Sequence, residues 1–522
     1  MPDLELEERD HVSISRWLIA IAVLSSAIME LVDTSAVNVS LPYIAGNLSA
    51  SVNESTWVLT SYLIANAVVL PMAGWLANYL GRRRLLLIAV SSFTAASILC
   101  GLAPSLSWLV FFRILQGAGG GSLQPASRAI LLETFPPRER GKAMAFWGVG
   151  IVVAPILAPV LGGWLTTDYS WRLIFFINVP IGVLAMVLVS LFITDPPYIR
   201  RTSNRIDYWG LAMLAIGMAA LQIMLDKGQE DDWFSSHFIV TLAVIAALGL
   251  TAFVIWEIRS PDPIVRFRLF RHRTFAVGVA LYAILAVVLF GSNVLMPLFM
   301  QELLGFPAIT AGWWVTPRGL VTMACMPLAG YLISRQWDMR RMLTFGVPMA
   351  ALGTLALASL NLHAGPWNFV PPQIAIGLGF SFTFVPLATI TVDPIRNEDM
   401  GYATSITGLV RNVGGAIGIS TVTTLLARRE QLYRSVLSAH VNRWNPAATA
   451  LRDGFERQLE RHGVNFFTAS HQALILVSRV VNAQARVLSY MDGFRFLAIL
   501  FLAVAPLIWV MKKPKTHHEV AG

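Results

Sequence analysis

The chain has 522 residues, of which 56% are hydrophobic and only 13% are charged, and its formal net charge is +9. A soluble domain carries roughly one quarter charged residues, so this composition excludes an ordinary soluble protein and predicts a polytopic membrane protein. The basic residues lie in short loops between apolar runs, so the positive charge indicates membrane topology rather than binding to nucleic acid.

Apolar runs of the roughly 20 residues that a membrane-spanning helix needs occur about fourteen times along the chain. The first run is too long for the core of a signal peptide and has no Ala-x-Ala cleavage site, so we interpret it as a retained anchor. We predict spans at 17–41, 56–77, 85–103, 107–131, 143–165, 173–193, 208–225, 238–256, 275–300, 311–334, 342–360, 369–390, 402–426 and 491–511.

Arginine and lysine clusters follow every second predicted span, and this alternation predicts that both termini are cytoplasmic. The long segment 427–490 is the exception, since it carries many arginines on the predicted outer side, but long loops cross a membrane largely regardless of their charge. The clusters are Arg82 to Arg84; Arg128, Arg138, Arg140 and Lys142; Arg200, Arg201 and Arg205; Arg259, Arg266, Arg268, Arg271 and Arg273; Arg335, Arg340 and Arg341; and Lys512, Lys513 and Lys515.

Two blocks of six spans flank a central pair, which predicts an all-α fold of two six-helix halves, 1–205 and 259–522, with two inserted helices at 206–258. A faint internal repeat supports this division. Gly74 to Arg84 and Gly330 to Arg341 each combine a glycine with an arginine cluster at the end of the second span of a block. Parallel repeats of this kind are typical of a large class of transporters whose binding site lies between the halves.

Two acids in the first span, Glu30 and Asp33, are the most unusual residues of the chain. A carboxylate inside a bilayer is costly unless it is paired, protonated or in contact with water, and the spacing of three residues places both on one helix face. Arg113 lies roughly 9 Å below the outer end of span four and Asp33 roughly 13 Å below Pro42, so the two side chains could pair. Asp33 is then the candidate principal proton carrier and Glu30 a second carrier or a substrate-binding acid. The alternative for Asp33 and Arg113 is a static ion pair between two helices.

Six motifs in order resemble those of the major facilitator superfamily, and specifically its fourteen-span drug:proton antiporters of the EmrB/QacA type. The resemblance covers nearly the whole chain. The motifs are Leu31 to Pro42, with an acid followed by Asn-Val-x-Leu-Pro; Gly74 to Arg84; Arg113 to Gly120; Gly150 to Pro155 with Pro159, Gly162 and Gly163; Trp171 to Gly182; and Leu221 to Gly228 with Trp233.

The resemblance implies gating roles for two of these motifs. Gly74, Asn78, Gly81 and Arg82 would lock the halves on the cytoplasmic side, but Asn78 replaces the family's aspartate, so its contact is reduced to hydrogen bonding. Arg82 could instead serve only as a topological signal. Gly150, Pro155, Pro159 and Gly163 would form a tight, kinked seal between the halves, because small residues let helices approach closely. Ala154 replaces a glycine usual in the family and loosens that expectation.

The substrate-binding residues are sought in both halves. Arg318 within span ten could face the cavity and bind the carboxylate of an amphiphile. Arg411 lies in a stretch that resembles a subgroup signature and is a gating or structural candidate, with helix packing around a satisfied guanidinium as the alternative. Large pockets are mostly apolar and aromatic, although any one aromatic of a membrane helix could equally contact lipid or core. With Glu30, the candidates are Asn38, Trp313, Trp314, Arg318, Phe380 and Phe384.

The predicted function is proton-driven export of hydrophobic drugs from the bacterial inner membrane, with the proton gradient in place of a cofactor. We find no hydrolytic, nucleotide-binding or metal-binding pattern in the sequence, including around Cys100 and Cys325. By resemblance, segment 427–490 is a candidate surface for an EmrA-type periplasmic adaptor that leads to a TolC-type outer-membrane channel; a cap on the membrane surface is the alternative. The rival functions are export of one physiological amphiphile, such as a fatty acid or siderophore, and a membrane scaffold or sensor that does not transport.

Overall fold

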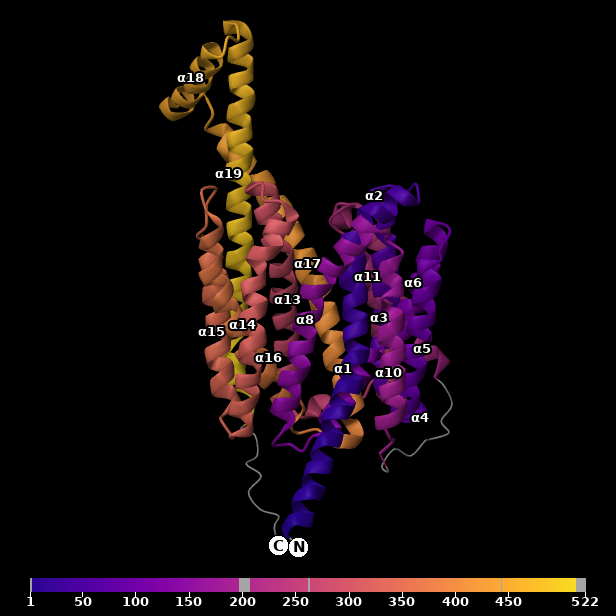
Figure 1. Ribbon diagram of the computed structural model, residues 1–522. Coiled ribbons are helices and arrows are strands. Elements are labelled where there is room, and N and C mark those ends of the chain that lie inside the picture. Colours follow the sequence, from indigo (N-terminus) through magenta and orange to yellow (C-terminus); the bar gives the residue numbers. More distant parts are fainter. Residues whose placement is uncertain (1, 197–206, 262, 443, 513–522) are drawn as a thin grey trace.

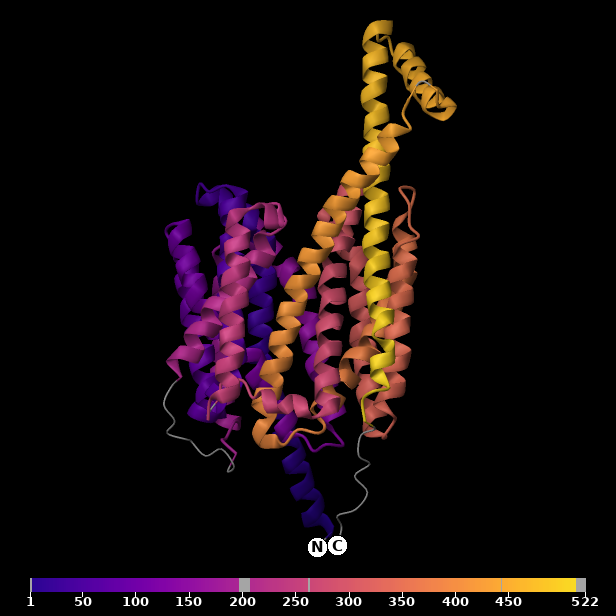
Figure 2. The ribbon, with the colours of Figure 1, turned by 180° about the vertical axis from the view of Figure 1, so that it is seen from behind.

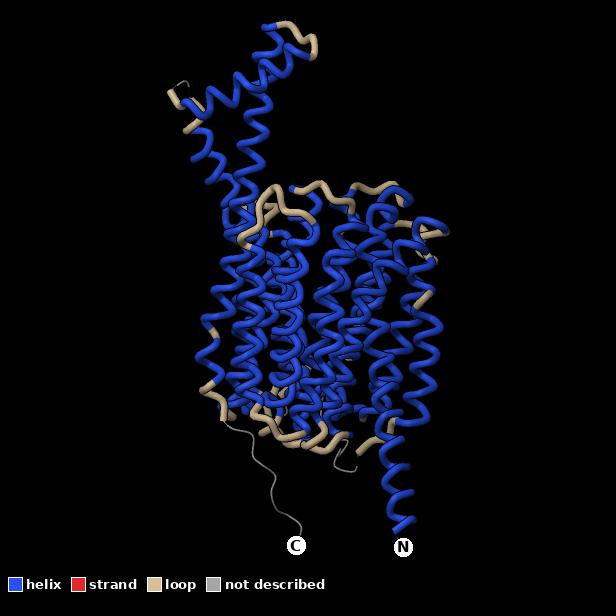
Figure 3. The backbone as a smooth tube through the Cα atoms, turned by 60° about the vertical axis from the view of Figure 1, so that its left-hand side comes forward, coloured by secondary structure: helices blue, strands red, loops and turns tan. Residues whose placement is uncertain are grey.

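The computed structural model of the protein describes residues 2–196, 207–261, 263–442 and 444–512, and every regular element in these ranges is helical (Figure 3). The predicted all-α membrane fold is therefore confirmed. Eleven helical stretches within the described residues are long and apolar enough to cross a membrane. The three remaining predicted spans, at 107–131, 311–334 and 342–360, are helical as well.

The first six predicted spans lie on the helices coloured from indigo to magenta in Figure 1. Pro71 has no main-chain N–H, and a short 3-10 turn at Leu70–Met72 divides the second span into α3 and α4. The elements are α1 (Pro2–Asn47), α2 (Val52–Ser55), α3 (Trp57–Val69), α4 (Ala73–Leu80), α5 (Arg82–Gly101), α6 (Leu106–Gly120), α7 (Leu123–Thr134), α8 (Arg140–Asp168), α9 (Leu173–Phe176) and α10 (Asn178–Phe192).

The inserted pair and the last six predicted spans follow. The inserted helices are α11 (Tyr208–Lys227) and α12 (His237–Arg259), and α11 packs against α3 of the first half. The second half contains α13 (Arg273–Leu298), α14 (Ala308–Ser334), α15 (Met339–Leu357), α16 (Val370–Val392), α17 (Met400–Ala439), α18 (Pro446–Arg461), α19 (Phe466–Ala503) and α20 (Ala505–Ile508). The predicted boundary between the first half and the inserted pair, at 205 and 206, lies outside the described residues, as do Arg200, Arg201, Arg205, Lys513 and Lys515.

Helix α1 begins, and the described residues end at Lys512, at the same end of the bundle (Figure 1). We call this end, at which α1 begins and α20 lies, the inner end, and the opposite end the outer end. The two halves contact one another chiefly through α8 with α14 and through α4 and α7 with α17. These contacts put the first and second halves side by side along a common interface, as the transporter fold requires.

Two long helices, α17 and α19, extend beyond the bundle at its outer end (Figure 2). They pack against one another, and α18 folds back against α19. The sequence predicts that apolar residues at helical spacing between 473 and 488 extend the last span outward, and the continuous helix α19 confirms this prediction. We call residues 427–490 the outer hairpin.

Candidate functional site

The first element of the candidate site is a buried ion pair between α1 and α6. The Arg113 guanidinium lies 2.6 Å from a carboxylate oxygen of Asp33, and both side chains are fully buried. Arg113 also donates to the main-chain oxygen of Val58 at 3.0 Å, and its guanidinium carbon lies 4.2 Å from the centre of the Tyr62 ring. The pair predicted from matching depths is therefore formed, and it joins the first, second and fourth predicted spans.

Two amides complete the surroundings of the Asp33 carboxylate. Its Oδ1 accepts hydrogen bonds from Gln116 at 2.9 Å and from Asn178 at 2.7 Å, while Arg113 donates to Oδ2. Hydrogen bonds to an ionised group are stronger than neutral ones, so this arrangement suits a charged carboxylate. Gln116 and Asn178 lie within two of the sequence motifs but are not among the predicted site residues. The only sequence feature that could have indicated this contact is that each residue is an amide within an apolar span.

Glu30 lies one helical turn before Asp33 and is only 6% exposed. Its Oε1 accepts a hydrogen bond from Asn66 at 2.9 Å, whereas its Oε2 accepts none from the part of the chain that the structure describes. A buried polar atom without a partner is costly, so Oε2 is a favourable place for a proton or for a polar group of a ligand. The two acids thus differ, because Asp33 is fully enclosed by donors and Glu30 is not.

Polar contacts across the two halves come from α7. Gln124 of α7 accepts a hydrogen bond from the Arg411 guanidinium of α17. Arg128 donates to the Tyr282 hydroxyl at 2.8 Å and to the Thr407 hydroxyl at 3.2 Å. Within the described residues, neither arginine has a carboxylate at ion-pair distance, in contrast to Arg113. At the interface between the halves these two guanidinium groups therefore donate to neutral acceptors, and the Glu30 carboxylate lies near enough to attract Arg411.

Arg318 adds to this positive charge from α14. It is 9% exposed and donates to Ser292 Oγ at 3.2 Å and to Asn293 Oδ1 at 3.1 Å, both on α13. No carboxylate among the described residues forms an ion pair with it. A buried guanidinium that meets only neutral acceptors retains donors for an anionic ligand.

The predicted aromatic residues do not form one continuous wall. Phe380 and Phe384 stack with ring centres 5.5 Å apart, and Phe384 is buried. Trp314 packs against Trp367, whereas Trp313 is 71% exposed. Asn38 is exposed on the outer part of α1. Of this set, the structure brings together only the Phe380 and Phe384 pair.

The motif of Gly74 to Arg84, in α4 and the start of α5, lies against the second half at the inner end. A Cβ atom built on Gly74 would lie 2.6 Å from the main-chain nitrogen of Tyr402, so the two backbones touch. Asn78 lies beside the Tyr402 side chain, which places a neutral polar group where the family has an aspartate. Gly81 has a φ of +89°, a conformation that favours glycine.

Arg82 is buried and forms an ion pair with Glu133 at 2.7 Å. Its guanidinium also lies beside Gly401 of α17, since a Cβ atom at 401 would be 2.8 Å from Nη1. The alternative of a purely topological role for Arg82 does not account for these contacts. Arg140 adds a further link between the halves by donating to Asn397 at 2.9 Å. In this structure the halves are therefore closed at the inner end.

Helix α8 supplies the close packing predicted for span five, but through other glycines than expected. Gly150 faces Leu24 of α1, within the first half, and a Cβ on Gly163 would have a single neighbour, at 3.9 Å. The close contacts with the second half come from Gly141, against Gly330, and from Gly148, against Met326. Pro155 is exposed, Ala154 is buried, and the side chain of Pro159 lies outside the described part of the structure.

Comparisons with known proteins agree with this architecture. The model of the Major Facilitator Superfamily matches residues 23–419. The chain is 37% identical over 502 residues to the multidrug export protein EmrB of Escherichia coli K12, which covers 95% of both chains. It is 36% identical to the fatty acid resistance protein FarB of Neisseria gonorrhoeae, over 93% of this chain and 94% of that protein.

Solved structures support the same fold at low sequence identity. The human organic anion transporter MFSD10 superposes with a TM-score of 0.61 at 11% identity, over 94% of this chain and 99% of that one. The proton:xylose symporter XylE superposes with a TM-score of 0.61 at 15% identity, over 96% and 97% of the two chains.

Proposed function

The chain belongs to the major facilitator superfamily, and on that premise we propose that it is a proton-coupled exporter of hydrophobic and amphiphilic compounds, similar to EmrB. It is a multi-pass membrane transporter rather than an enzyme. The observation that carries the coupling proposal is the buried pair of Asp33 and Arg113, with Glu30 one turn away and short of a donor. The proton gradient supplies the energy, and no cofactor is required.

The proposed coupling step is an exchange of partners in the first half. When Asp33 is charged, it holds α1, α6 and α10 together through Arg113, Gln116 and Asn178. A proton on Asp33 removes the charge that orders these donors and changes the relative stability of the two conformations of the transporter. Substrate and proton then occupy the protein in alternation, and the halves rock about the site between them.

Glu30→Gln is expected to lower the number of protons released on substrate binding and to leave the fold intact, because Oε1 of glutamine can still accept from Asn66. The measurement is substrate-induced proton release from purified protein in proteoliposomes, with a panel of cationic, neutral and carboxylate compounds. Tyr43→Phe, at an exposed residue near the outer end of the same helix, is the control. Unchanged proton release and unchanged affinity for every compound would remove Glu30 from the site.

Export of a carboxylate amphiphile is the second candidate, favoured by the likeness to FarB and by three arginines that form no ion pair within the described residues, of which Arg128 and Arg318 are buried. Arg128, Arg318 and Arg411 present guanidinium groups with only neutral acceptors. A long-chain fatty acid would pair its carboxylate with one of them and bury its chain against the apolar walls. Arg318 is the best placed of the three, because Arg128 already has three neutral acceptors and Arg411 lies near the Glu30 carboxylate.

Arg318→Gln is expected to raise the KM for a fatty acid by about tenfold or more, since a hydrogen bond to a charged group is worth about 1.5–3 kcal/mol. The KM for a neutral drug of similar size should change little. Arg335→Gln, at the exposed end of the same helix, is the matched control. Equal losses for the acid and the neutral compound would mean that Arg318 has a structural role only. The assay is transport of both compounds into inverted vesicles.

The outer hairpin is the proposed docking surface for a periplasmic adaptor, in a protein that lies in the bacterial inner membrane with both termini cytoplasmic. It exposes large apolar side chains: Trp444 is 91% exposed, Phe466 71% and Phe467 75%. Exposed apolar groups of this size are typical of contact surfaces. The same groups would also suit a cap that rests on the membrane surface.

Deleting residues 442–463 is expected to change transport in vesicles by less than about twofold, as for a surface change remote from the core. Resistance of whole cells should nevertheless be lost, because the route to an outer-membrane channel requires the adaptor. Replacing Phe466 and Phe467 by serine, which keeps the helix, should reproduce the loss of resistance. If deletion abolishes vesicle transport as well, the hairpin belongs to the transport cycle and not to adaptor docking.

A further inference from the structure

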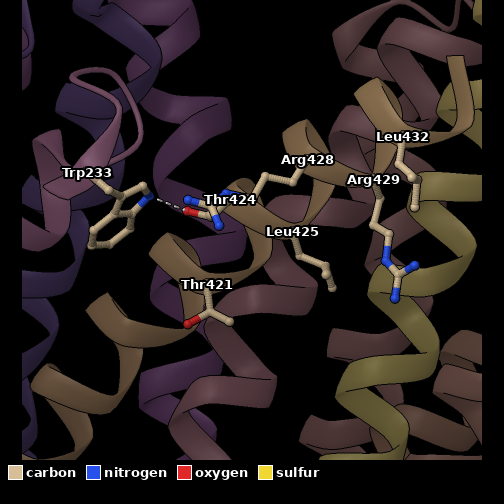
Figure 4. Close-up of a pocket in the computed structure, with 7 residues that line it drawn as sticks. All are labelled: Trp233, Thr421, Thr424, Leu425, Arg428, Arg429 and Leu432. Atoms are coloured by element: carbon tan, nitrogen blue, oxygen red, sulfur yellow. Dashed lines mark hydrogen bonds between the residues drawn. The ribbon is translucent and has the colours of Figure 1, made fainter. Parts of the chain in front are cut away.

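An open pocket of about 600 Å³ lies between the inserted pair and α17 (Figure 4). One wall is Trp233, from the connection between α11 and α12, and the other is the outer part of α17. The α17 residues are Thr421, Thr424, Leu425, Arg428, Arg429 and Leu432. The pocket takes no part in the proton-coupling site described above.

The pocket bridges the two halves of the protein at the outer end. Asp226, at the end of α11, accepts a hydrogen bond from Thr60 of α3 at 2.5 Å, which fixes the inserted pair to the first half. The Trp233 indole N–H donates to Thr424 of α17, in the second half, at 2.9 Å. The predicted thirteenth span ends at residue 426, so Arg428 lies at the level where the apolar spans end.

Trp233 is held in an unusual conformation to reach this position. Its φ is +52°, and that of the preceding Asp232 is +55°. For a bulky residue a positive φ is a genuine outlier, and such strain persists where the surrounding structure enforces it, often at ligand sites. The motif of Leu221 to Gly228 with Trp233 therefore places a strained tryptophan against α17. The proton-coupling site does not require a tryptophan at this position.

The pocket combines positive charge with an apolar lining. Arg429 pairs with Asp492 of α19 at 3.4 Å, whereas Arg428 forms no ion pair within the described residues and extends from α17 toward Trp233 (Figure 4). Arginines set membrane topology from cytoplasmic loops, so Arg428, on the predicted outer side, does not serve as a topological signal. Tryptophan and arginine at the boundary of the apolar region are the side chains that contact lipid headgroups.

We propose that this pocket binds an anionic phospholipid of the outer leaflet. The Arg428 guanidinium pairs with the headgroup phosphodiester, and the acyl chains lie over Leu425, Leu432 and the face of Trp233. Charge complementarity selects a headgroup without an ammonium, because an ammonium would compete with Arg428 for the phosphate. One wall belongs to the inserted pair, which Asp226 ties to the first half, and the other belongs to the second half. A bound lipid therefore also favours the arrangement of the halves seen here.

The test is native mass spectrometry of the full-length protein titrated with dioleoylphosphatidylglycerol. Arg428→Gln is expected to weaken binding about fivefold, as expected for one arginine near a membrane surface. Arg434→Gln, an exposed arginine of the same helix outside the pocket, should bind as the wild type does. Brominated phosphatidylglycerol should quench tryptophan fluorescence, and the part of the quenching that comes from Trp233 should be missing in Trp233→Phe.

Four outcomes would overturn the proposal. The first is equal lipid binding by wild type and Arg428→Gln, and the second is equal binding of phosphatidylcholine. Displacement of the lipid by free glycerol phosphate at the same concentration would indicate a site for a soluble anion. Displacement by transported drug, with a higher KM for drug in Arg428→Gln, would indicate a substrate exit site. The thermal unfolding transition of each variant is measured as a control, to check that only folded proteins are compared.

Discussion

Asp33→Asn is expected to abolish proton-coupled transport and to lower stability at the same time. The substitution leaves Arg113 fully buried without its carboxylate, and breaking one side of a buried ion pair typically costs about 3–5 kcal/mol. Transport driven by an imposed pH gradient should fall to the level of empty proteoliposomes. Thermal unfolding in detergent measures the loss of stability, and fluorescent-substrate uptake measures the loss of coupling.

A charge-balanced double variant separates the proton carrier from a static ion pair. Asp33→Asn combined with Arg113→Gln removes both charges, so most of the lost stability should return, because no buried charge is left unpaired. Coupled transport should remain absent if Asp33 carries the proton. Recovery of stability and transport together would mean that the pair only holds α1 to α6. Asp168→Asn, an exposed acid at the outer end of α8, is the control for loss of a single acid.

The helical spans were predictable because apolar runs and loop charges depend only on local sequence. The breaks within spans were harder to predict from the sequence. The sequence shows Pro71, but not whether the chain bends there or continues through a 3-10 turn. The outward extension of α19 was foreseen because its apolar residues repeat at helical spacing, whereas the fold of α18 back against α19 depends on contacts between distant segments.

The ion pair of the site was predictable because buried charge is costly and only one arginine of the first half has a matching depth. The neutral partners were not. Gln116 and Asn178 add hydrogen bonds but carry no charge, so nothing in their position along the chain distinguishes them from other amides. The same holds for Gln124, whose contact with Arg411 joins helices that are remote in sequence.

The glycines of α8 also show what a motif alone does not predict. Gly150 and Gly163 belong to a family motif, yet the glycines that touch the second half are Gly141 and Gly148. A motif indicates which helix needs small residues, but which face of that helix meets a neighbour depends on the conformational state. Gly74 is the glycine for which motif and structure agree, because it touches the backbone of the other half.

Gly74→Ala is therefore expected to hold the halves apart at the inner end. The added Cβ would lie 2.6 Å from the Tyr402 nitrogen and 2.7 Å from the Gly401 carbonyl carbon, and main-chain atoms cannot swing aside as a side chain can. This contact exists only while α4 and α17 are together, so the clash destabilises the closed inner end and not the fold. A clash of about 3 kcal/mol changes the ratio of the two conformations by roughly a hundredfold.

Spin labels at the exposed positions 84 and 398, on a background without Cys100 and Cys325, report this change as a longer distance in Gly74→Ala. Export should fall by at least about tenfold, because a transporter held in one state cannot complete its cycle. Gly46→Ala is the matched control, since a Cβ there meets nothing within 4 Å. An unchanged distance with normal export would mean that the contact between Gly74 and Tyr402 does not open during transport. In that case the inner end would stay closed while the halves move about it. The ion pair of Arg82 and Glu133, which lies beside Gly401, would then help to keep the inner end rigid.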